Sequence, residues 1–376
     1  MTPSIRLGRL FGIEVGFNWS LIFIFALVAW TLATSVLPDV ASGYGAGIYW
    51  IIAAIGAVLF YASLLAHELS HAIVARRNGV KVAGITLWLF GGVSRLEGEP
   101  ASARAEALIA GVGPLTSFVI AAIAFAVAAV TSSNALLSGL FGWLTFVNLV
   151  LGLFNLVPAF PLDGGRILSS LLWWRSGSRQ RGVHNAVRVG RLFAYLMIAG
   201  GVLGVFLGGG LNGAWMAILG WFLLSAGASE EAGSAVRSLL RSVPVSAAMT
   251  SPVVTLPDWV SVEQFLESVA PNHPFTTYPV HEPSGRLTGV VRLSDLVRLP
   301  AGERGRKHLI DVARPIAEVP VTNPREDLSA LIQRIGSGLE QRVLVFDNGK
   351  LVGILSPADI ARVLTIRQSA GAATRT

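Results

Sequence analysis

The chain has 376 residues, of which 53% are hydrophobic and 14% are charged, against roughly 25% charged residues in ordinary soluble domains. This composition excludes a single soluble globular protein and indicates a membrane protein. The formal net charge is +7, and the excess lies in the apolar part, because residues 1–243 hold fifteen Lys/Arg and nine Asp/Glu. Such a distribution orients a membrane domain and argues against nucleic-acid binding. Cysteine is absent, which excludes disulfides and thiolate metal sites.

Six apolar segments are each close to the roughly 20 residues that a helix needs to cross a bilayer core. They cover residues 16–36, 46–75, 105–131, 136–157, 184–208 and 212–229. The loops after the first, third and fifth segments contain no Lys or Arg, whereas the opposite loops hold nearly all the basic residues of this part. By the positive-inside rule, both ends of this part face the cytoplasm. The sequence therefore predicts a polytopic α-helical membrane domain with six transmembrane helices.

Between the second and third segments, the stretch VKVAGITLWLFGGVSRLEGEP combines β-branched and aromatic residues with Gly91 and Gly92. This pattern predicts a short β-hairpin at residues 80–95, and its apolar character places the hairpin at the membrane interface. Open backbone is tolerated there only where it is buried in protein or lines a wet cavity. A strand of this hairpin is therefore a candidate to pair with an extended peptide.

The second segment contains LLAHELSHAIVA, which sets His67, Glu68 and His71 in a run otherwise suited to hydrocarbon. An ionisable side chain at mid-depth costs about 3 kcal/mol or more, so such residues indicate a functional site. The four-residue spacing puts both imidazoles on one face of a helix, one turn apart, where they can hold one metal ion. Glu68 can then take a proton from a metal-bound water. The alternative interpretation is a pair of histidines satisfied at a helix interface.

The third metal ligand is expected to be Asp163. A catalytic zinc usually has three protein ligands and one open position. The other acidic residues of the membrane part lie in or next to loops, whereas Asp163 falls at a depth similar to that of the histidines. Pro158 and Pro161 interrupt the fourth segment and let this carboxylate turn toward the interior. The alternative is an N-cap for the helix that starts near Gly164.

After residue 243 the composition becomes that of a soluble domain, and an internal repeat appears. GRLTGVVRLSDLVRL at residues 285–299 aligns with GKLVGILSPADIARV at residues 349–363. Each copy fits a small β-α-β-β-α unit, so we predict a soluble α/β tandem. The domains are expected to be a membrane domain, two repeats and a flexible tail, at residues 1–243, 244–303, 304–368 and 369–376.

AHELSH together with NLVPAFPLDGGR resembles the site-2 protease family of intramembrane zinc metalloproteases, in its six-span branch. GPLTS, from Gly113 to Ser117, resembles the small-residue pattern of the family's third span. The resemblance implies one catalytic zinc per chain, bound by His67, His71 and Asp163, with Glu68 as the catalytic base. It also matches Asn155 to an asparagine of the second motif, either as an oxyanion donor or as a structural residue at the helix break. Phe160 stands where the family often has a second proline.

The repeats resemble a pair of cystathionine-β-synthase-type (CBS) domains, which implies an adenine nucleotide in the cleft between them. In such domains a Ser or Thr three residues before an Asp contacts the ribose and phosphate, and SPAD supplies Ser356 and Asp359. The first copy departs from this pattern, because Arg292 precedes Asp295. The alternative is that both aspartates cap the closing helices. A dimer through the CBS domains is a further expectation.

The expected function is therefore an intramembrane zinc endopeptidase that hydrolyses peptide bonds within or near transmembrane segments, with nucleotide regulation through the CBS pair. Its partners would be a transmembrane protein substrate and the lipid bilayer, in a prokaryotic plasma membrane with the CBS domains in the cytoplasm. One alternative is a proteolytically inactive membrane receptor or scaffold that senses nucleotides. Another is a gated transporter, which predicts polar residues along a path, whereas here the ionisable residues of the spans cluster at one depth.

Overall fold

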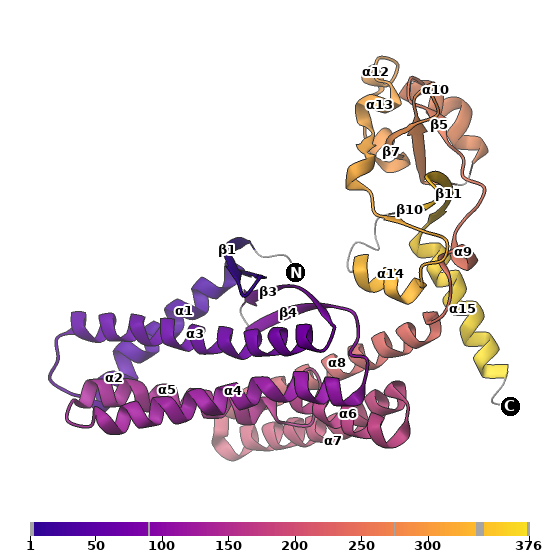
Figure 1. The fold of residues 1–376 in the computed structure, drawn as a ribbon. Helices are drawn as coiled ribbons and strands as arrows, with labels where there is room; N and C mark the ends of the chain where they lie inside the picture. Colours follow the sequence, from indigo (N-terminus) through magenta and orange to yellow (C-terminus); the bar gives the residue numbers. More distant parts are fainter. Residues whose placement is uncertain (1–3, 89–90, 274, 336–341, 374–376) are drawn as a thin grey trace. The chain divides into compact units, whose positions relative to one another are not determined.

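The computed structural model of the chain describes residues 4–88, 91–273, 275–335 and 342–373 (Figure 1). The chain divides into two compact units, Met1–Ala235 and Val236–Thr376. The first unit holds the long apolar helices and one sheet, and the second holds two small sheets with short helices.

The helices of the first unit follow the predicted apolar segments closely. Their bounds are α1 Ser20–Thr31, η1 Leu32–Val36, α2 Leu37–Val40, α3 Ala46–Arg77, α4 Ala103–Val130, α5 Ala135–Asn155, α6 Asp163–Ser176 and α7 Arg179–Gly204. Among the described residues, five helical stretches are long and apolar enough to cross a membrane. These are residues 20–40, α3, α4, α5 and one stretch of 62 residues, Arg179–Leu240. The structure therefore has the long apolar helices that a polytopic membrane protein requires.

The 62-residue stretch is not one straight helix. It consists of α7, η2 Val205–Gly209 and α8 Gly210–Leu240, and the backbone leaves helical geometry at Leu207 and at Gly208, whose φ is +88°. A Cβ on Gly201 of α7 would stand 2.6 Å from the carbonyl oxygen of Gly213 on α8. Further down the pair, Glu231 of α8 accepts hydrogen bonds from His184 and Arg191 of α7. The two helices therefore pack antiparallel, and glycines allow their close approach.

The first unit also contains a four-stranded sheet in the order β1-β2-β3-β4. Its strands are β1 Ile5–Leu10, β2 Ile13–Phe17, β3 Lys81–Trp88 and β4 Gly91–Glu97. The predicted hairpin is present as the antiparallel pair β3 and β4, while residues 89–90 at its turn lie outside the described residues. The strands β1 and β2 were not expected, and the first helix begins at Ser20 rather than at residue 16.

The order of the strands decides which edge of the sheet is free. Because β2 pairs in parallel with β3, through Val15 opposite Ile85, β3 lies inside the sheet and β4 is an edge strand. Ile85 and Leu87 of β3 pack against Leu64 and Ala72 of α3, so one face of the sheet covers this helix (Figure 1). The sheet therefore lies along the part of α3 that carries the histidines.

The second unit contains two sheets, β5-β6-β7-β8 and β11-β10-β9. Their strands are β5 Leu256–Pro257, β6 Thr277–His281, β7 Leu287–Arg292, β8 Arg314–Pro315, β9 Val321–Thr322, β10 Val343–Asp347 and β11 Lys350–Leu355. The main helices are α9 Val245–Ala248, α11 Leu293–Val297, α13 Leu309–Val312, α14 Leu328–Ile335 and α15 Pro357–Ala373. Each sheet carries its own apolar core, as expected for two repeats.

Two features near the ends of the repeats were not expected from the sequence. Val245 and Ala248 of α9 pack in the core of the second repeat, with Leu328 and Val345, although the sequence placed them at the start of the first. Residues 369–373, which we expected in the flexible tail, continue α15, and residues 374–376 lie outside the described residues.

Candidate metal centre

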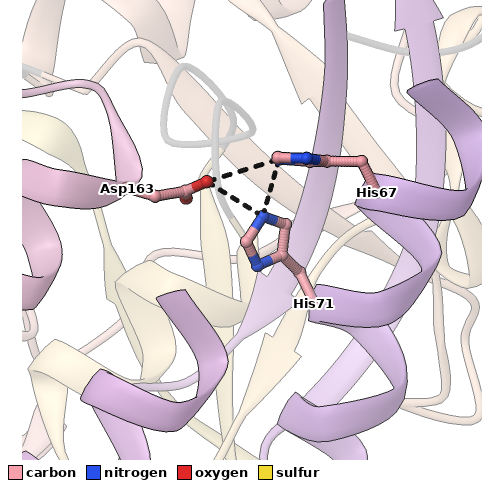
Figure 2. Close-up of side chains that lie close together, drawn as sticks. All are labelled: His67, His71 and Asp163. Atoms are coloured by element: carbon pink, nitrogen blue, oxygen red, sulfur yellow. Dashed lines mark hydrogen bonds and ion pairs between the residues drawn. The ribbon is translucent and has the colours of Figure 1, made fainter. Parts of the chain in front are cut away.

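The side chains of His67, His71 and Asp163 meet inside the first unit (Figure 2). Both histidines project from α3, one turn apart, and Asp163 is the first residue of α6. The two Nε2 atoms are 3.2 Å apart, and each lies 3.3 Å from Oδ2 of Asp163. The structure therefore brings together the three side chains that the sequence singled out as ligands.

Hydrogen bonds on the outer side of each ring set its orientation. Nδ1 of His71 donates to the carbonyl oxygen of Ile109 over 2.6 Å, which leaves the lone pair of Nε2 directed at the cluster. Nδ1 of His67 lies 2.9 Å from the hydroxyl of Ser117. Both histidines are buried, and Ser117 has no exposed surface. Both partners belong to α4, so this helix determines how the ligand atoms on α3 point.

The donor set fits a zinc ion. Ligand atoms about 2.0 Å from a tetrahedral ion are about 3.3 Å apart, which matches the observed spacing. Oδ2 of Asp163 is buried, no described residue donates a hydrogen bond to it, and a buried carboxylate oxygen needs a compensating charge. The alternative of Asp163 as an N-cap is not observed, because Leu162 holds the N-cap position of α6 and makes no side-chain cap bond. Two imidazoles and one carboxylate also leave one position of a tetrahedron open.

Gly113 of α4 lies against the ligand atoms. A Cβ at this position would stand 2.2 Å from Nε2 of His71 and 2.6 Å from Nε2 of His67, so a side chain would occupy the ligand cluster itself. Gly113 and Ser117 are the first and last residues of GPLTS, which the sequence had marked only as a small-residue pattern. Their contacts with the two histidines are the physical reason for small residues here.

Glu68 does not join the cluster of ligand atoms but points to strand β4. Its Oε2 accepts a hydrogen bond of 2.9 Å from the hydroxyl of Ser94. A Cβ on Gly92 would stand 2.1 Å from Cγ of Glu68, so the strand backbone passes directly beside this side chain. Neither contact was expected from the sequence. The Gly91-Gly92 pair was the one feature of the sequence that could have indicated them.

Asn155 is the last residue of α5. Its Nδ2 donates to the carbonyl oxygen of Leu151, one turn earlier, over 3.0 Å. This contact is with the backbone of its own helix, so the structural role of Asn155 at the helix break also stays a prediction. Its role as an oxyanion donor stays a proposal.

A buried ion cluster holds the first turns of α4. Nη1 of Arg179 lies 2.6 Å from Oε1 of Glu99, and Nε of the same guanidinium lies 3.3 Å from Oε2 of Glu106. Glu106 is buried, one turn before the carbonyl group of Ile109 that orients His71. From the sequence, these acidic residues were expected in or next to loops, and their ion pairs with Arg179 were not expected.

The candidate nucleotide residues of the second unit lie in different settings. Asp359 accepts a hydrogen bond from the hydroxyl of Ser356 over 2.6 Å at the start of α15, and its other oxygen accepts from Thr250. Asp295 lines a pocket of about 270 Å³ together with Arg292, Arg314 and Arg342. The first pair thus forms a helix cap, whereas Asp295 faces a cationic pocket.

Comparisons with known proteins agree with the composition of this site. The family model "Peptidase family M50" matches residues 55–139 and 129–198, which include all three residues of the cluster. The CBS domain model matches residues 245–302 and 310–366. These matches cover the metal cluster in the first unit and both repeats in the second.

Two relatives align with this chain over nearly their whole length. Rip3 of Mycobacterium tuberculosis is 41% identical over 371 residues, which cover 97% of this chain and 94% of Rip3. The sll0528 protein of Synechocystis is 30% identical, with 97% and 96% covered, and both names contain the words zinc metalloprotease. A solved site-2 protease from Methanocaldococcus jannaschii is 28% identical with a TM-score of 0.40, and covers 60% of this chain and 94% of that chain.

Proposed function

The chain belongs to peptidase family M50, the site-2 protease family, and we propose that it is a zinc endopeptidase that hydrolyses peptide bonds within or near transmembrane segments of other membrane proteins. The observation that carries this proposal is the convergence of three ligand atoms within 3.3 Å of one another, on two buried histidines and a half-buried aspartate. Burial of such groups without a cation would be costly, and the long apolar helices support a site within the membrane.

His67, His71 and Asp163 would hold the zinc, which supplies Lewis acidity at its open position. Glu68, next to the first ligand in sequence, would accept a proton from the attacking water and pass it to the leaving amine. Asn155 is the candidate donor to the oxyanion, once its amide exchanges the carbonyl group of Leu151 for the substrate. Ser117 and the carbonyl group of Ile109 keep the two imidazoles in the orientation that binding requires.

A transmembrane substrate hides its carbonyl groups in helical hydrogen bonds, so it must become extended before attack. We propose that strand β4 receives the extended segment, because of the two edge strands, β1 and β4, it is β4 that passes beside Glu68. The inner strand β3 is paired on both sides and has no free edge for this role. Main-chain pairing on β4 would satisfy the exposed backbone groups of the substrate.

The test is cleavage of single-span substrates by the purified protein in detergent. Wild type is expected to cleave, and both Glu68→Gln and removal of metal with a chelator are expected to abolish cleavage. Metal content is measured on the same samples, because Glu68→Gln should keep zinc while Asp163→Ala should lose it. Unchanged cleavage by Glu68→Gln would contradict the proposal.

We further propose that the CBS pair binds an adenine nucleotide and regulates the protease. The cationic pocket supports a phosphate group near Arg292, Arg314 and Arg342, with Asp295 placed for a ribose hydroxyl. Ser356 and Asp359 are the corresponding candidates in the second repeat. Calorimetric titration of the full chain with AMP, ADP and ATP tests this proposal. Arg292→Ala should weaken binding, whereas Arg298→Ala, at an exposed residue outside the pocket lining, should not.

The same pocket supports the alternative of an inactive receptor or scaffold. That alternative predicts nucleotide binding together with no cleavage by a zinc-loaded wild type, so the two assays separate the hypotheses. For location, we propose six spans in a prokaryotic plasma membrane, formed by residues 20–40, α3, α4, α5, α7 and α8. Both termini and the CBS domains would face the cytoplasm, and a dimer through the CBS domains is a further proposal.

A further inference from the structure

Strand β4 presents two of its residues to the helix that carries the histidines. Ser94 is opposite Ile85 in the β3–β4 register, and Gly92 is opposite Leu87. Directly opposite residues of an antiparallel pair share one face of the sheet. Because Ile85 and Leu87 pack on α3, Ser94 and Gly92 also face this helix. The sheet therefore brings the hydroxyl of Ser94 and the backbone of Gly92, which has no side chain, against the same part of α3.

That place is the side chain of Glu68. The hydroxyl of Ser94 donates to Oε2 of Glu68 over 2.9 Å and also lies 3.4 Å from the carbonyl oxygen of the same residue. Within the described part of the chain, Ser94 gives the Glu68 carboxylate its only hydrogen bond. The backbone at Gly92 confines the side chain from a second direction, because a Cβ there would stand 2.6 Å from Cδ of Glu68.

A glutamate side chain has three rotatable bonds, and a general base works only if its carboxylate stays within hydrogen-bond reach of the proton it accepts. We propose that Ser94 is a positioning residue that holds the Glu68 carboxylate for proton transfer. By donating to Oε2, Ser94 leaves Oε1 free to accept the proton. This inference rests on the proposed protease function and deepens it. Among the described residues, the Ser94 hydroxyl bonds Glu68 and none of the three candidate metal ligands.

The position of Ser94 gives this contact a second consequence. Ser94 belongs to the edge strand on which we place the extended substrate. A peptide paired with β4 would therefore be held by the same strand that holds the base, so that substrate and base share one rigid element. Rigid placement of two reacting groups lowers the entropy cost of their encounter.

Thr86 provides a matched control within the same sheet. It lies on β3 between Ile85 and Leu87, so its side chain belongs to the opposite face. Thr86 is buried, and its hydroxyl forms no hydrogen bond with the described residues. Replacement by valine removes a hydroxyl from the sheet at nearly constant volume, without touching Glu68.

The experiment compares full-length wild type, Ser94→Ala, Ser94→Thr and Thr86→Val in detergent with a single-span substrate. We expect Ser94→Ala to lower kcat about 10- to 100-fold, because a small misplacement of a reacting group costs up to ~100-fold, with KM within about twofold. Ser94→Thr, which keeps the hydroxyl, should recover most of kcat. Thr86→Val should match wild type, and all four proteins should bind one zinc ion.

Two outcomes would overturn the inference: wild-type kcat in Ser94→Ala, or a loss in Ser94→Thr as large as in Ser94→Ala. If wild type cleaves and Glu68→Gln does not, either of these outcomes rejects the role of Ser94 alone. If zinc-loaded wild type does not cleave at all, the proposed function fails together with the inference. An experimental structure of Ser94→Ala gives a readout independent of turnover, because the Glu68 carboxylate should leave its position beside β4.

Discussion

Gly113 lies so close to His71 that a Cβ on the glycine would stand 2.2 Å from Nε2 of the histidine. Real Cβ atoms do not approach other heavy atoms this closely, so any larger residue must displace the ring or the helix. The atom that would move is one of the three that form the candidate metal centre. A single backbone position of α4 thus decides whether the ligand atoms can converge.

We predict that Gly113→Ala lowers zinc content and cleavage strongly while the protein stays folded. Glycine to alanine normally stabilises a helix interior by about 0.5–1 kcal/mol, so helix propensity works against the loss. Insertion of a methyl group into a packed site costs about 1–3 kcal/mol, here at the expense of ligand geometry. Zinc per chain, measured by mass spectrometry of the purified protein, checks the prediction.

Gly111→Ala is the control for this prediction. Gly111 lies on the same helix, and a Cβ there would meet no atom within 4 Å. It should keep zinc and activity. Full zinc occupancy in Gly113→Ala would show that the glycine is not needed for convergence of the ligands.

Ser117 should tune the affinity for zinc rather than decide whether zinc binds. Loss of a hydrogen bond to the outer nitrogen of a histidine ligand typically costs 10- to 100-fold in affinity or activity, so we expect a loss of about that size in Ser117→Ala. Competition with a chelator of known affinity measures it. Thr116→Val is the matched control, because the Thr116 hydroxyl bonds only its own helix, at Val112. Equal affinity in both variants would remove Ser117 from the metal site.

The sequence predicted the meeting of His67, His71 and Asp163 because each signal is local. A spacing of four residues fixes two imidazoles on one helix face, and the helix break at Pro158 and Pro161 marks the only carboxylate at a matching depth. The contacts that orient these ligands were not predictable in the same way. One of these contacts is with the backbone carbonyl group of Ile109. Every residue has such a group, so the sequence does not show which one accepts the hydrogen bond.

Long-range pairing explains what the sequence analysis missed in the fold. Strands β1 and β2 are short, and β2 pairs with residues of β3 that lie more than sixty positions later in the sequence. No local sequence pattern therefore predicts this sheet. The hairpin of β3 and β4 has its turn glycines in sequence and was predicted. Likewise, α9 packs into the core of the second repeat although in sequence it begins the first, because burial of Val245 depends on the tertiary fold rather than on chain order.

Asp327 should make the stability of the second repeat depend on pH. Burial raises the pKa of Asp327, but hydrogen bonds from Ser329 and from the backbone N–H groups of Ala330 and Ser242 outweigh burial, and its pKa lies below the usual value. A lowered pKa means that this stabilisation is complete above the unfolded value of about 3.9 and is lost as pH falls through the folded value.

We therefore predict that Asp327→Asn destabilises α14 at pH 7 by about 0.3–1 kcal/mol, because asparagine keeps a capping oxygen and only the negative charge at the helix N-terminus is lost. The difference from wild type should shrink as the pH is lowered below about 4. Hydrogen exchange of the Leu328–Leu331 amides, compared with wild type at each pH, measures the effect. Asp347→Asn, at an exposed residue whose carboxylate accepts no bond from the described residues, should show no such difference. A difference that does not depend on pH would refute the ionic origin.

The antiparallel packing of α7 and α8 predicts that the turn between them lies outside the cell. The chain lacks cysteine, so single substitutions can be labelled without background. With six spans, cysteines at Ser42, Ser133 and Asn212 should react with a membrane-impermeant maleimide added to intact cells, because these positions are exposed. Ser42 and Ser133 lie in loops without Lys or Arg, and Asn212 lies in the first turn of α8, next to the turn that follows α7. A cysteine at Ser284 should react only after lysis. Labelling at Asn212 tests whether α7 and α8 both cross the membrane. If labelling there also requires lysis, the two helices do not both cross. The proposed path would then not bring the second unit to the same side of the membrane as the N-terminus.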